Sequence, residues 1–261
     1  MDTSSPLLVR RDGPVATLTL YRPGTRNALN RELVRALGDA LADVAADGDV
    51  RAVVLTGSGE SFCSGADLKS AMTESQDVDM AQRIDEFHAI IKTITHAAKP
   101  FIAAIDGAAV GFGADLALAC DLRVMSNRGY LQEKFVKIGL MPDGGGSFWL
   151  PRLVGLGRAL EFLMLGTKIE ATLALELGLV NRMVVPEELD KSAAALASEL
   201  AKGPPLALTA IKTTVRESAI GGIDEALARE KAGQVKLLTS QDLMEGVMAW
   251  AQRRDPEFKG K

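Results

Sequence analysis

Residues 101–121 read FIAAIDGAAVGFGADLALACD and hold a strand, a turn and a helix in direct succession. Phe101–Ile105 is a short apolar run behind Pro100, which favours a buried strand. A glycine-rich turn follows over 106–115, and the apolar run 115–119 predicts a short helix. Backbone N–H groups at such a junction are unpaired and point outward, aided by the helix dipole. The stretch therefore indicates an α/β fold with a turn able to bind a ligand.

The pattern around this stretch extends the α/β prediction in both directions. Further strands are expected at 15–20, 50–56, 122–125 and 179–185, and helices at 30–46 (with Asn30 as N-cap), 82–97 and 159–177. Beyond Pro186 the pattern is helical throughout, with helices expected at 187–201, 205–219, 223–238 and 241–253. The sequence thus predicts a core over residues 1–195 and a C-terminal helical region over 196–261.

Composition limits the classes of protein. The 261 residues are 47% hydrophobic and carry a net charge of −4 with a pI near 5.4, which disfavours nucleic-acid partners. Cys63 and Cys120 are too few for a disulfide framework and lack metal-site spacing. Neither a signal peptide nor a membrane-spanning run is visible, so a soluble cytoplasmic protein without a membrane or metal partner is expected.

A second glycine-rich turn, SFCSGADL at 61–68, follows the strand expected at 50–56. Two such turns can aim two backbone amides at one developing negative charge, or they can simply be tight turns. The dinucleotide fingerprint fails at Leu116, the glycines at 144–146 lack the lysine of a phosphate-binding loop, and Cys63 stands where a nucleophile elbow needs glycine.

Together the two turns resemble signature segments of the enoyl-CoA hydratase/isomerase (crotonase) superfamily. The matching blocks occur in order along nearly the whole chain: Arg26–Leu29, FCSGADL at 62–68, IAAIDG at 102–107, GFGADLALACD at 111–121, IGLMPDGGG at 138–146, LPRLVG at 150–155, and Gly178–Asn181. Glu245-Gly246 and Arg254, Pro256 and Phe258 match the end. The ordered set makes the resemblance specific.

The resemblance implies a spiral of β-β-α units that binds an acyl-CoA thioester as substrate, without a further cofactor. It also implies C-terminal helices that mediate a homotrimer, or a hexamer made of two trimers. The metabolism of fatty acids or aromatic acids is the implied setting.

The resemblance also carries site residues. The backbone amides of Ala66 and Phe112 match the oxyanion hole that holds the thioester oxygen, although family members usually have glycine at the second position. Arg26 and Ala28 are expected to line the coenzyme A channel, and Asp67 looks more like a turn or helix-cap carboxylate than a catalytic one. The full set of expected substrate-binding residues is Arg26, Ala28, Ala66, Asp67, Leu68 and Phe135.

The acids decide the reaction. Hydratases of the family use two glutamates; the first falls on Asp115, and the second falls on Phe135, which transfers no proton. Asp143 matches the aspartate of phenylacetate-type isomerases and the nucleophile of 4-chlorobenzoyl-CoA dehalogenases. Its alternative is a plain Pro-Asp-Gly turn residue. Asp115 and Asp143 are therefore the expected catalytic residues.

His88 matches the dehalogenase base, although a lone helical histidine is more often structural or solvated. These residues rank double-bond isomerisation first and hydration of a 2-enoyl-CoA second. Covalent dehalogenation or thioester hydrolysis through Asp143 comes third. A non-catalytic acyl-CoA-binding protein is the alternative from another class.

Overall fold

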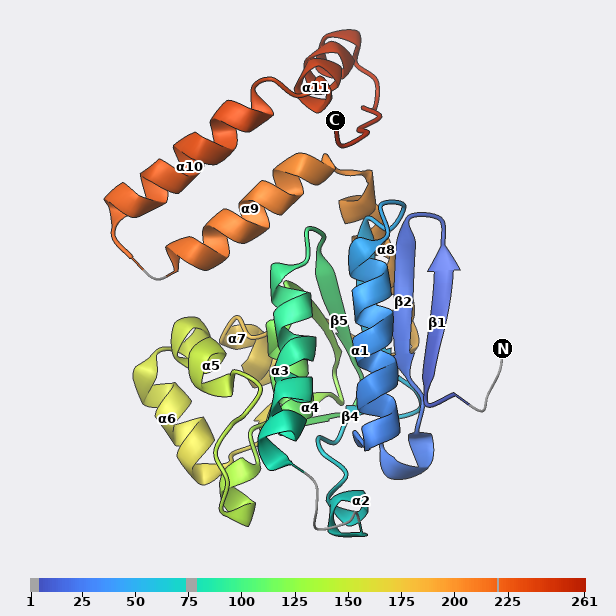
Figure 1. The fold of residues 1–261 in the computed structure, drawn as a ribbon, viewed down its shortest axis with the longest axis vertical. Coiled ribbons are helices and arrows are strands. Elements are labelled where there is room, and N and C mark those ends of the chain that lie inside the picture. Colours follow the sequence, from blue (N-terminus) through green and yellow to red (C-terminus); the bar gives the residue numbers. More distant parts are fainter. Residues whose placement is uncertain (1–4, 74–78, 220) are drawn as a thin grey trace.

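The computed structural model describes residues 5–73, 79–219 and 221–261. Within these residues a six-stranded sheet has the order β1-β2-β3-β5-β7-β10, with β1 antiparallel to β2 and the other neighbours parallel. Its strands are β1 (Leu7–Asp12), β2 (Val15–Leu20), β3 (Ala52–Gly57), β5 (Phe101–Ile105), β7 (Leu122–Ser126) and β10 (Arg182–Val184). The α/β class expected from the sequence is confirmed (Figure 1).

A second, smaller sheet runs β4-β6-β8-β9 and was not foreseen from the sequence. It consists of β4 (Ser61–Cys63), β6 (Ala108–Val110), β8 (Tyr130–Gln132) and β9 (Ile169–Glu170). Three times, a strand of the large sheet is followed along the chain by a strand of the small one: β3 by β4, β5 by β6 and β7 by β8. Strands of two or three residues are too short to show a hydrophobic period, so the pattern of the sequence does not reveal them.

Helices cover both faces of the large sheet. On one face α1 (Arg31–Ala46) inserts Leu33, Leu37 and Leu41 into the main core cluster, which also contains Leu18 and Leu55. The Asn30 side chain accepts a hydrogen bond from the Leu33 amide, as predicted for its N-cap.

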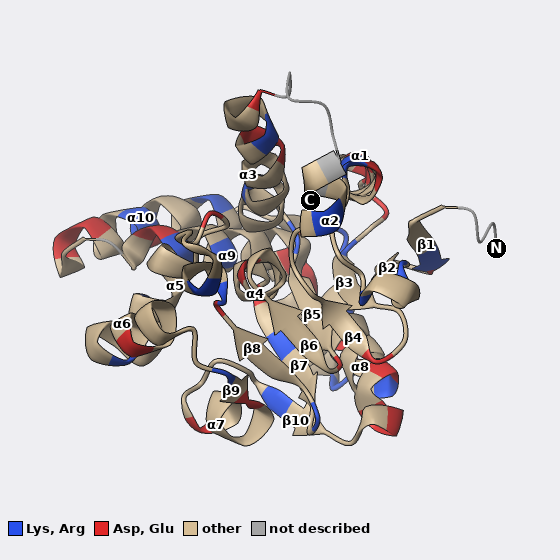
Figure 2. Cartoon of the chain, turned by 90° about the horizontal axis from the view of Figure 1, so that it is seen from below, with Lys and Arg blue, Asp and Glu red and all other residues tan. Residues whose placement is uncertain are grey.

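On the opposite face α8 (Leu189–Lys202) packs Leu196 and Ala197 against Val54 and Ile102 in a second core cluster. In the ribbon of Figure 2 the charged residues colour mainly the helices, whereas the strands are largely tan.

Further helices lie between α1 and α8 along the chain, and some of them carry residues of the site. They are α2 (Leu68–Thr73), α3 (Met80–His96), α4 (Phe112–Ala119), α5 (Gly146–Val154), α6 (Leu156–Leu165) and α7 (Ala171–Glu176). The single helix expected over 159–177 is wrong: Gly166, at φ 59°, ends α6, and β9 precedes α7. The strand expected at 179–185 shrinks to β10, because Leu179 and Val180 are buried in an irregular segment.

The C-terminal helices α9 (Pro205–Ser218), α10 (Ile223–Leu237) and α11 (Gln241–Gln252) extend away from the two sheets (Figure 1). Their positions match the expected helices within two residues. The predicted division between residues 195 and 196 falls inside α8, so that helix contributes to both regions. None of the helices in the described ranges is both long and apolar enough to cross a lipid bilayer.

Candidate functional site

The two glycine-rich turns lie against each other, as the sequence predicts. Gly65 has φ +89°, and a Cβ on it would lie 2.7 Å from the Val110 carbonyl oxygen and 3.7 Å from the Phe112 nitrogen. Glycine is therefore required at position 65 for the loops to approach this closely. Within the described residues, the amides of Ala66 and Phe112 donate to no protein acceptor. Both N–H groups are thus available to a ligand.

Aromatic rings surround the second turn. Phe112 is buried at the start of α4, and its ring meets Phe87 of α3 edge-on, with centroids 4.5 Å apart. The ring of Phe135 also lies close to the turn, 3.7 Å from the position of a Cβ on Gly111. The side chain of Phe112 is therefore packed inside the protein, while its backbone amide has no acceptor among the described residues.

Three acids gather beneath this turn. Asp115, in the first turn of α4, has no solvent exposure, and its Oδ2 accepts a hydrogen bond from the Gly144 amide at 3.0 Å. Asp143, in the turn before α5, is half-buried, and its Oδ1 has no hydrogen-bond partner. Glu133, directly after β8, is only 3% exposed, and neither of its oxygens has a partner. The tertiary structure thus brings Asp115 and Asp143 together, as expected, and adds a third acid.

Burial governs the protonation of all three. Loss of hydration, followed by the charge of Asp143, raises the pKa of Asp115 to about 7, while the hydrogen bond from the Gly144 amide and the nearby Gly146 amide and Glu133 side chain oppose the shift. Burial also raises the pKa of Glu133 well above its usual range, and the charge of Asp115 adds to the effect. The pKa of Asp143 is raised by burial, with its own backbone amide and His88 opposing. The acids therefore differ in readiness to lose a proton.

Sequence reasoning missed Glu133. It stands between Gln132 and Lys134 in a polar run that suits a surface loop, and no spacing marks it as buried. Its burial results from α4 and the 144–146 turn closing over the end of β8. Phe135, two residues later, provides a ring instead of the second family glutamate, as the sequence predicts.

Because Gly146 has no side chain, the acids can occupy the space beside it. A Cβ at this position would lie 2.7 Å from Glu133 Oε1 and 2.8 Å from Asp115 Oδ1. Both side chains are buried, so neither can move aside without disturbing the packing around it.

Gly146→Ala is therefore expected to displace the acids and lower kcat about a hundredfold, because misplacement by about 1 Å costs roughly that much. Steady-state kinetics on the acyl-CoA thioester expected from the sequence test this. Gly157→Ala in α6 is the matched control, since nothing lies within 4 Å of its added Cβ. Equal activity of the two variants would contradict the steric requirement for glycine at position 146.

His88 lies beside Asp143 but contacts its backbone. The Nε2 atom of His88 is 2.9 Å from the Asp143 carbonyl oxygen, a distance suited to a hydrogen bond from a protonated Nε2. The contact links α3 to the 142–145 turn. It favours the structural reading of His88, in which the ring fixes the turn that carries Asp143.

The residues expected along the coenzyme A channel differ in their hydrogen bonds and in their exposure to solvent. Arg22 donates to the Ala28 carbonyl and, at 3.0 Å, to Asp67. Asp67 Oδ1 accepts from the Ser70 amide at the start of α2. Hydrogen bonds from Ser70, then Arg22, lower the pKa of Asp67, as expected of a cap carboxylate. Ala28 is buried, whereas Leu68 is 48% exposed beside Asp67.

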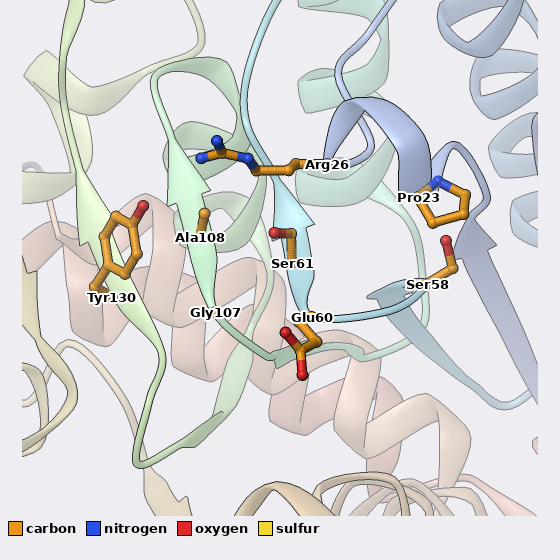
Figure 3. Close-up of a pocket in the computed structure, with 8 residues that line it drawn as sticks. All are labelled: Pro23, Arg26, Ser58, Glu60, Ser61, Gly107, Ala108 and Tyr130. Atoms are coloured by element: carbon orange, nitrogen blue, oxygen red, sulfur yellow. The ribbon is translucent and has the colours of Figure 1, made fainter.

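Arg26 faces a polar pocket of about 490 Å³. Figure 3 shows its guanidinium crossing the small sheet above Ala108 toward Tyr130. The pocket lining includes Ser61, Ala108 and Tyr130, the first residues of β4, β6 and β8. Ala66 and Phe112, by contrast, follow the carboxyl ends of β4 and β6. The backbone of Arg26 lies at the same end of β4 as Ala66, because its carbonyl accepts a hydrogen bond from the Ser64 amide at 3.0 Å, whereas its side chain lines the pocket.

Comparison with known proteins agrees with this arrangement. The family described as enoyl-CoA hydratase/isomerase matches residues 10–261. A probable enoyl-CoA hydratase of Rhodobacter capsulatus is 38% identical over 247 residues, 95% of each chain. The 1,2-epoxyphenylacetyl-CoA isomerase of Escherichia coli is 34% identical over 250 residues, again 95% of each.

A solved structure of the family has the same fold. The crystal structure of enoyl-CoA hydratase from Bacillus anthracis matches with a TM-score of 0.94 and 30% identity, covering 98% of this chain and 100% of that one. The spiral of β-β-α units inferred from the sequence motifs is thereby confirmed. This chain is an enzyme of the enoyl-CoA hydratase/isomerase family, within the crotonase superfamily.

Proposed function

We propose that the enzyme isomerises an enoyl-CoA thioester by moving its double bond, with Asp115 and Asp143 as the two proton-transferring acids. The observation that carries this proposal is the pair of acids behind two unpaired backbone amides, one acid fully buried and one half-buried. Acids whose environments separate their pKa values divide into a base and an acid.

In this proposal, the N–H groups of Ala66 and Phe112 donate hydrogen bonds to the thioester oxygen of a 3-enoyl-CoA. Charge accumulates on that oxygen when the proton on C2 is removed, so fixed donors favour the enolate over the ground state. Ala28, Leu68 and Phe135 would border the ligand, while Arg26 and Asp67 would act at its coenzyme A end.

Asp143 serves as the base, because it is the more accessible of the two acids and Oδ1 lacks a partner. It takes the C2 proton, and the electron pair of that C–H bond delocalises onto the thioester oxygen. Asp115 is the acid, because burial keeps it protonated near neutral pH. Its proton goes to C4 as the enolate collapses, which leaves the double bond between C2 and C3 and no net change in the composition of the substrate. Before the next turnover Asp143 releases its proton and Asp115 takes one up, by exchange with solvent.

Hydration of a 2-enoyl-CoA is the second candidate. Its support is the similarity to the probable enoyl-CoA hydratase of Rhodobacter capsulatus and to the solved enoyl-CoA hydratase of Bacillus anthracis. A water held between two acids would add across the double bond with the same oxyanion donors. Phe135, at the position of the second family glutamate, weighs against this reaction.

Two substrates separate the candidates. With a 3-enoyl-CoA, the isomerase gains conjugated enoyl-thioester absorbance without a change in mass. With crotonyl-CoA, a hydratase loses that absorbance and gains one water. Isomerisation of the first and inertness toward the second is the expected result. Water addition to crotonyl-CoA at the faster rate would contradict the proposal, and binding of both without turnover would point to a non-catalytic member.

We further propose that the enzyme is a cytoplasmic homotrimer or dimer of trimers assembled through α9, α10 and α11. Support comes from the large apolar side chains that these helices expose, including Ile211 at 58%, Ile223 at 70% and Trp250 at 82%. Such a surface is unusual on an isolated protein. Sedimentation at micromolar concentration tests the assembly, and a monomer throughout would contradict it.

A further inference from the structure

Glu133 has the geometry of a partner for Asp115. The position of a Cβ on Gly146 is 2.7 Å from Glu133 Oε1 and 2.8 Å from Asp115 Oδ1, so the two oxygens converge on one small space. Asp115 Oδ1 has no hydrogen-bond partner, whereas Oδ2 already accepts from the Gly144 amide. The free oxygen of Asp115 is therefore the one on the Glu133 side.

Two buried carboxylates cannot both be ionised at this separation without a large cost. Glu133 is the group with less to lose by keeping its proton, because both of its oxygens lack a partner while Asp115 has the Gly144 amide. A protonated carboxyl group is also the only state in which Glu133 can donate a hydrogen bond.

We propose that Glu133 is a positioning residue that stays protonated during turnover and donates its O–H to Asp115 Oδ1. Asp115 is then held at both oxygens, by Glu133 and by the Gly144 amide. The donated hydrogen bond stabilises the ionised form of Asp115 and so counteracts part of the burial that keeps Asp115 protonated. Glu133 thereby sets the pH at which Asp115 loses its proton, without touching the substrate.

Other polar and charged groups lie near Glu133 and Asp115. Asp115 approaches from α4, and Asp143 from the turn before α5, with His88 of α3 behind that turn. The Trp149 indole N–H of α5 is a further buried donor without a partner. Lys134 and Lys137, which follow Glu133 in the chain, are exposed to solvent.

The inference rests on the proposed isomerase and is tested by the pH dependence of kcat/KM in two variants. Protonated Asp115 is the active form, so kcat/KM of the wild type is expected to fall as the pH rises through about 7. This fall is the limb of the pH profile that the variants are compared on. Glu133→Gln keeps a donor to Asp115, so the limb stays in place. Glu133→Met removes the donor, so the pKa of Asp115 rises and the limb moves up by about one unit, a tenfold change in acid constant.

Other roles of Glu133 predict different shifts of the pH limb. If Glu133 were ionised, removing its charge would lower the limb in both variants, which would overturn the inference. A purely structural role would slow both variants without moving the limb, which would also overturn it. Glu161→Gln, at an exposed position of α6, is the control and should change neither rate nor limb.

A second readout needs no activity. Infrared spectra are recorded at about pH 8.5, above the titration of Asp115. The difference between the wild type and either variant, Glu133→Gln or Glu133→Met, should show a protonated carboxyl band that belongs to the wild type. Absence of that band in the wild type would overturn the inference even if the isomerase is active. Its presence in an inactive wild type would support the placement of the proton while the proposed function fails.

Discussion

Asp115→Asn is expected to lower kcat of the isomerisation about a thousandfold, within the range that positioned acid–base groups contribute. The amide cannot return a proton to C4, yet it has nearly the same shape and can accept from the Gly144 amide. The falling limb near pH 7 should disappear with the carboxyl group. Steady-state rates across pH test both effects, and a retained limb would assign it to another residue.

The same variant should change how stability depends on pH. Burial raises the pKa of Asp115 from 3.8 to about 7, so its contribution to the free energy of unfolding is complete below pH 3.8 and is lost as the pH rises through 7. Ionised and buried, the side chain costs on the order of a few kcal/mol. Asp115→Asn removes that cost.

Urea unfolding at about pH 5 and about pH 8 measures the difference. The variant should gain more stability relative to the wild type at pH 8 than at pH 5, because the loss in the wild type is only partial at the lower value. Asp190→Asn, an exposed position in α8, serves as the control and should match the wild type at both. An equal effect of Asp115→Asn at the two values would mean that Asp115 does not titrate between them.

Asp143→Asn is expected to lower kcat by about two to three orders of magnitude, because the base that removes the C2 proton is lost. KM should change little, since the thioester contacts proposed for Ala66 and Phe112 remain. The rising limb of the pH profile should vanish, because ionisation of Asp143 is required for the base to act. Exchange of the C2 hydrogen with deuterated water provides a direct assay of this step.

The control for Asp143→Asn is Asp85→Asn, which changes an exposed acid on α3, the helix that carries His88. It should leave kcat, KM and both limbs unchanged. An Asp143→Asn variant that still exchanges the C2 hydrogen at the wild-type rate would refute the role of base. An acyl adduct on Asp143 in the wild type, seen by mass spectrometry, would instead support covalent chemistry.

The sequence predicts the longer elements well because their period is visible. Leu33, Leu37 and Leu41 recur at helical spacing and form the buried face of α1, and Phe101–Ile105 is the expected buried strand. The strands of the small sheet have two or three residues and no period to read. The helix expected over 159–177 fails at Gly166, whose left-handed conformation ends α6.

Local sequence also identified the two turns and two of the three buried acids. Glycines at 65, 111 and 144 mark places where the backbone must approach a neighbour or adopt positive φ, and motif order connects those places to one family. Asp115 and Asp143 follow from the same motifs. These features are encoded by residues close to one another in the chain, so a single sequence contains the signal.

Only the tertiary structure placed Glu133 among the acids and showed which pocket Arg26 lines. Glu133 lies in a polar run that suits the surface, and it is buried because α4 and the 144–146 turn, distant in sequence, close over it. The sequence also does not reveal that the Arg26 side chain lines a pocket with Ala108 and Tyr130. Burial and direction depend on which segments meet in space, and the pKa shifts of the acids arise from that burial rather than from neighbouring residues in the chain.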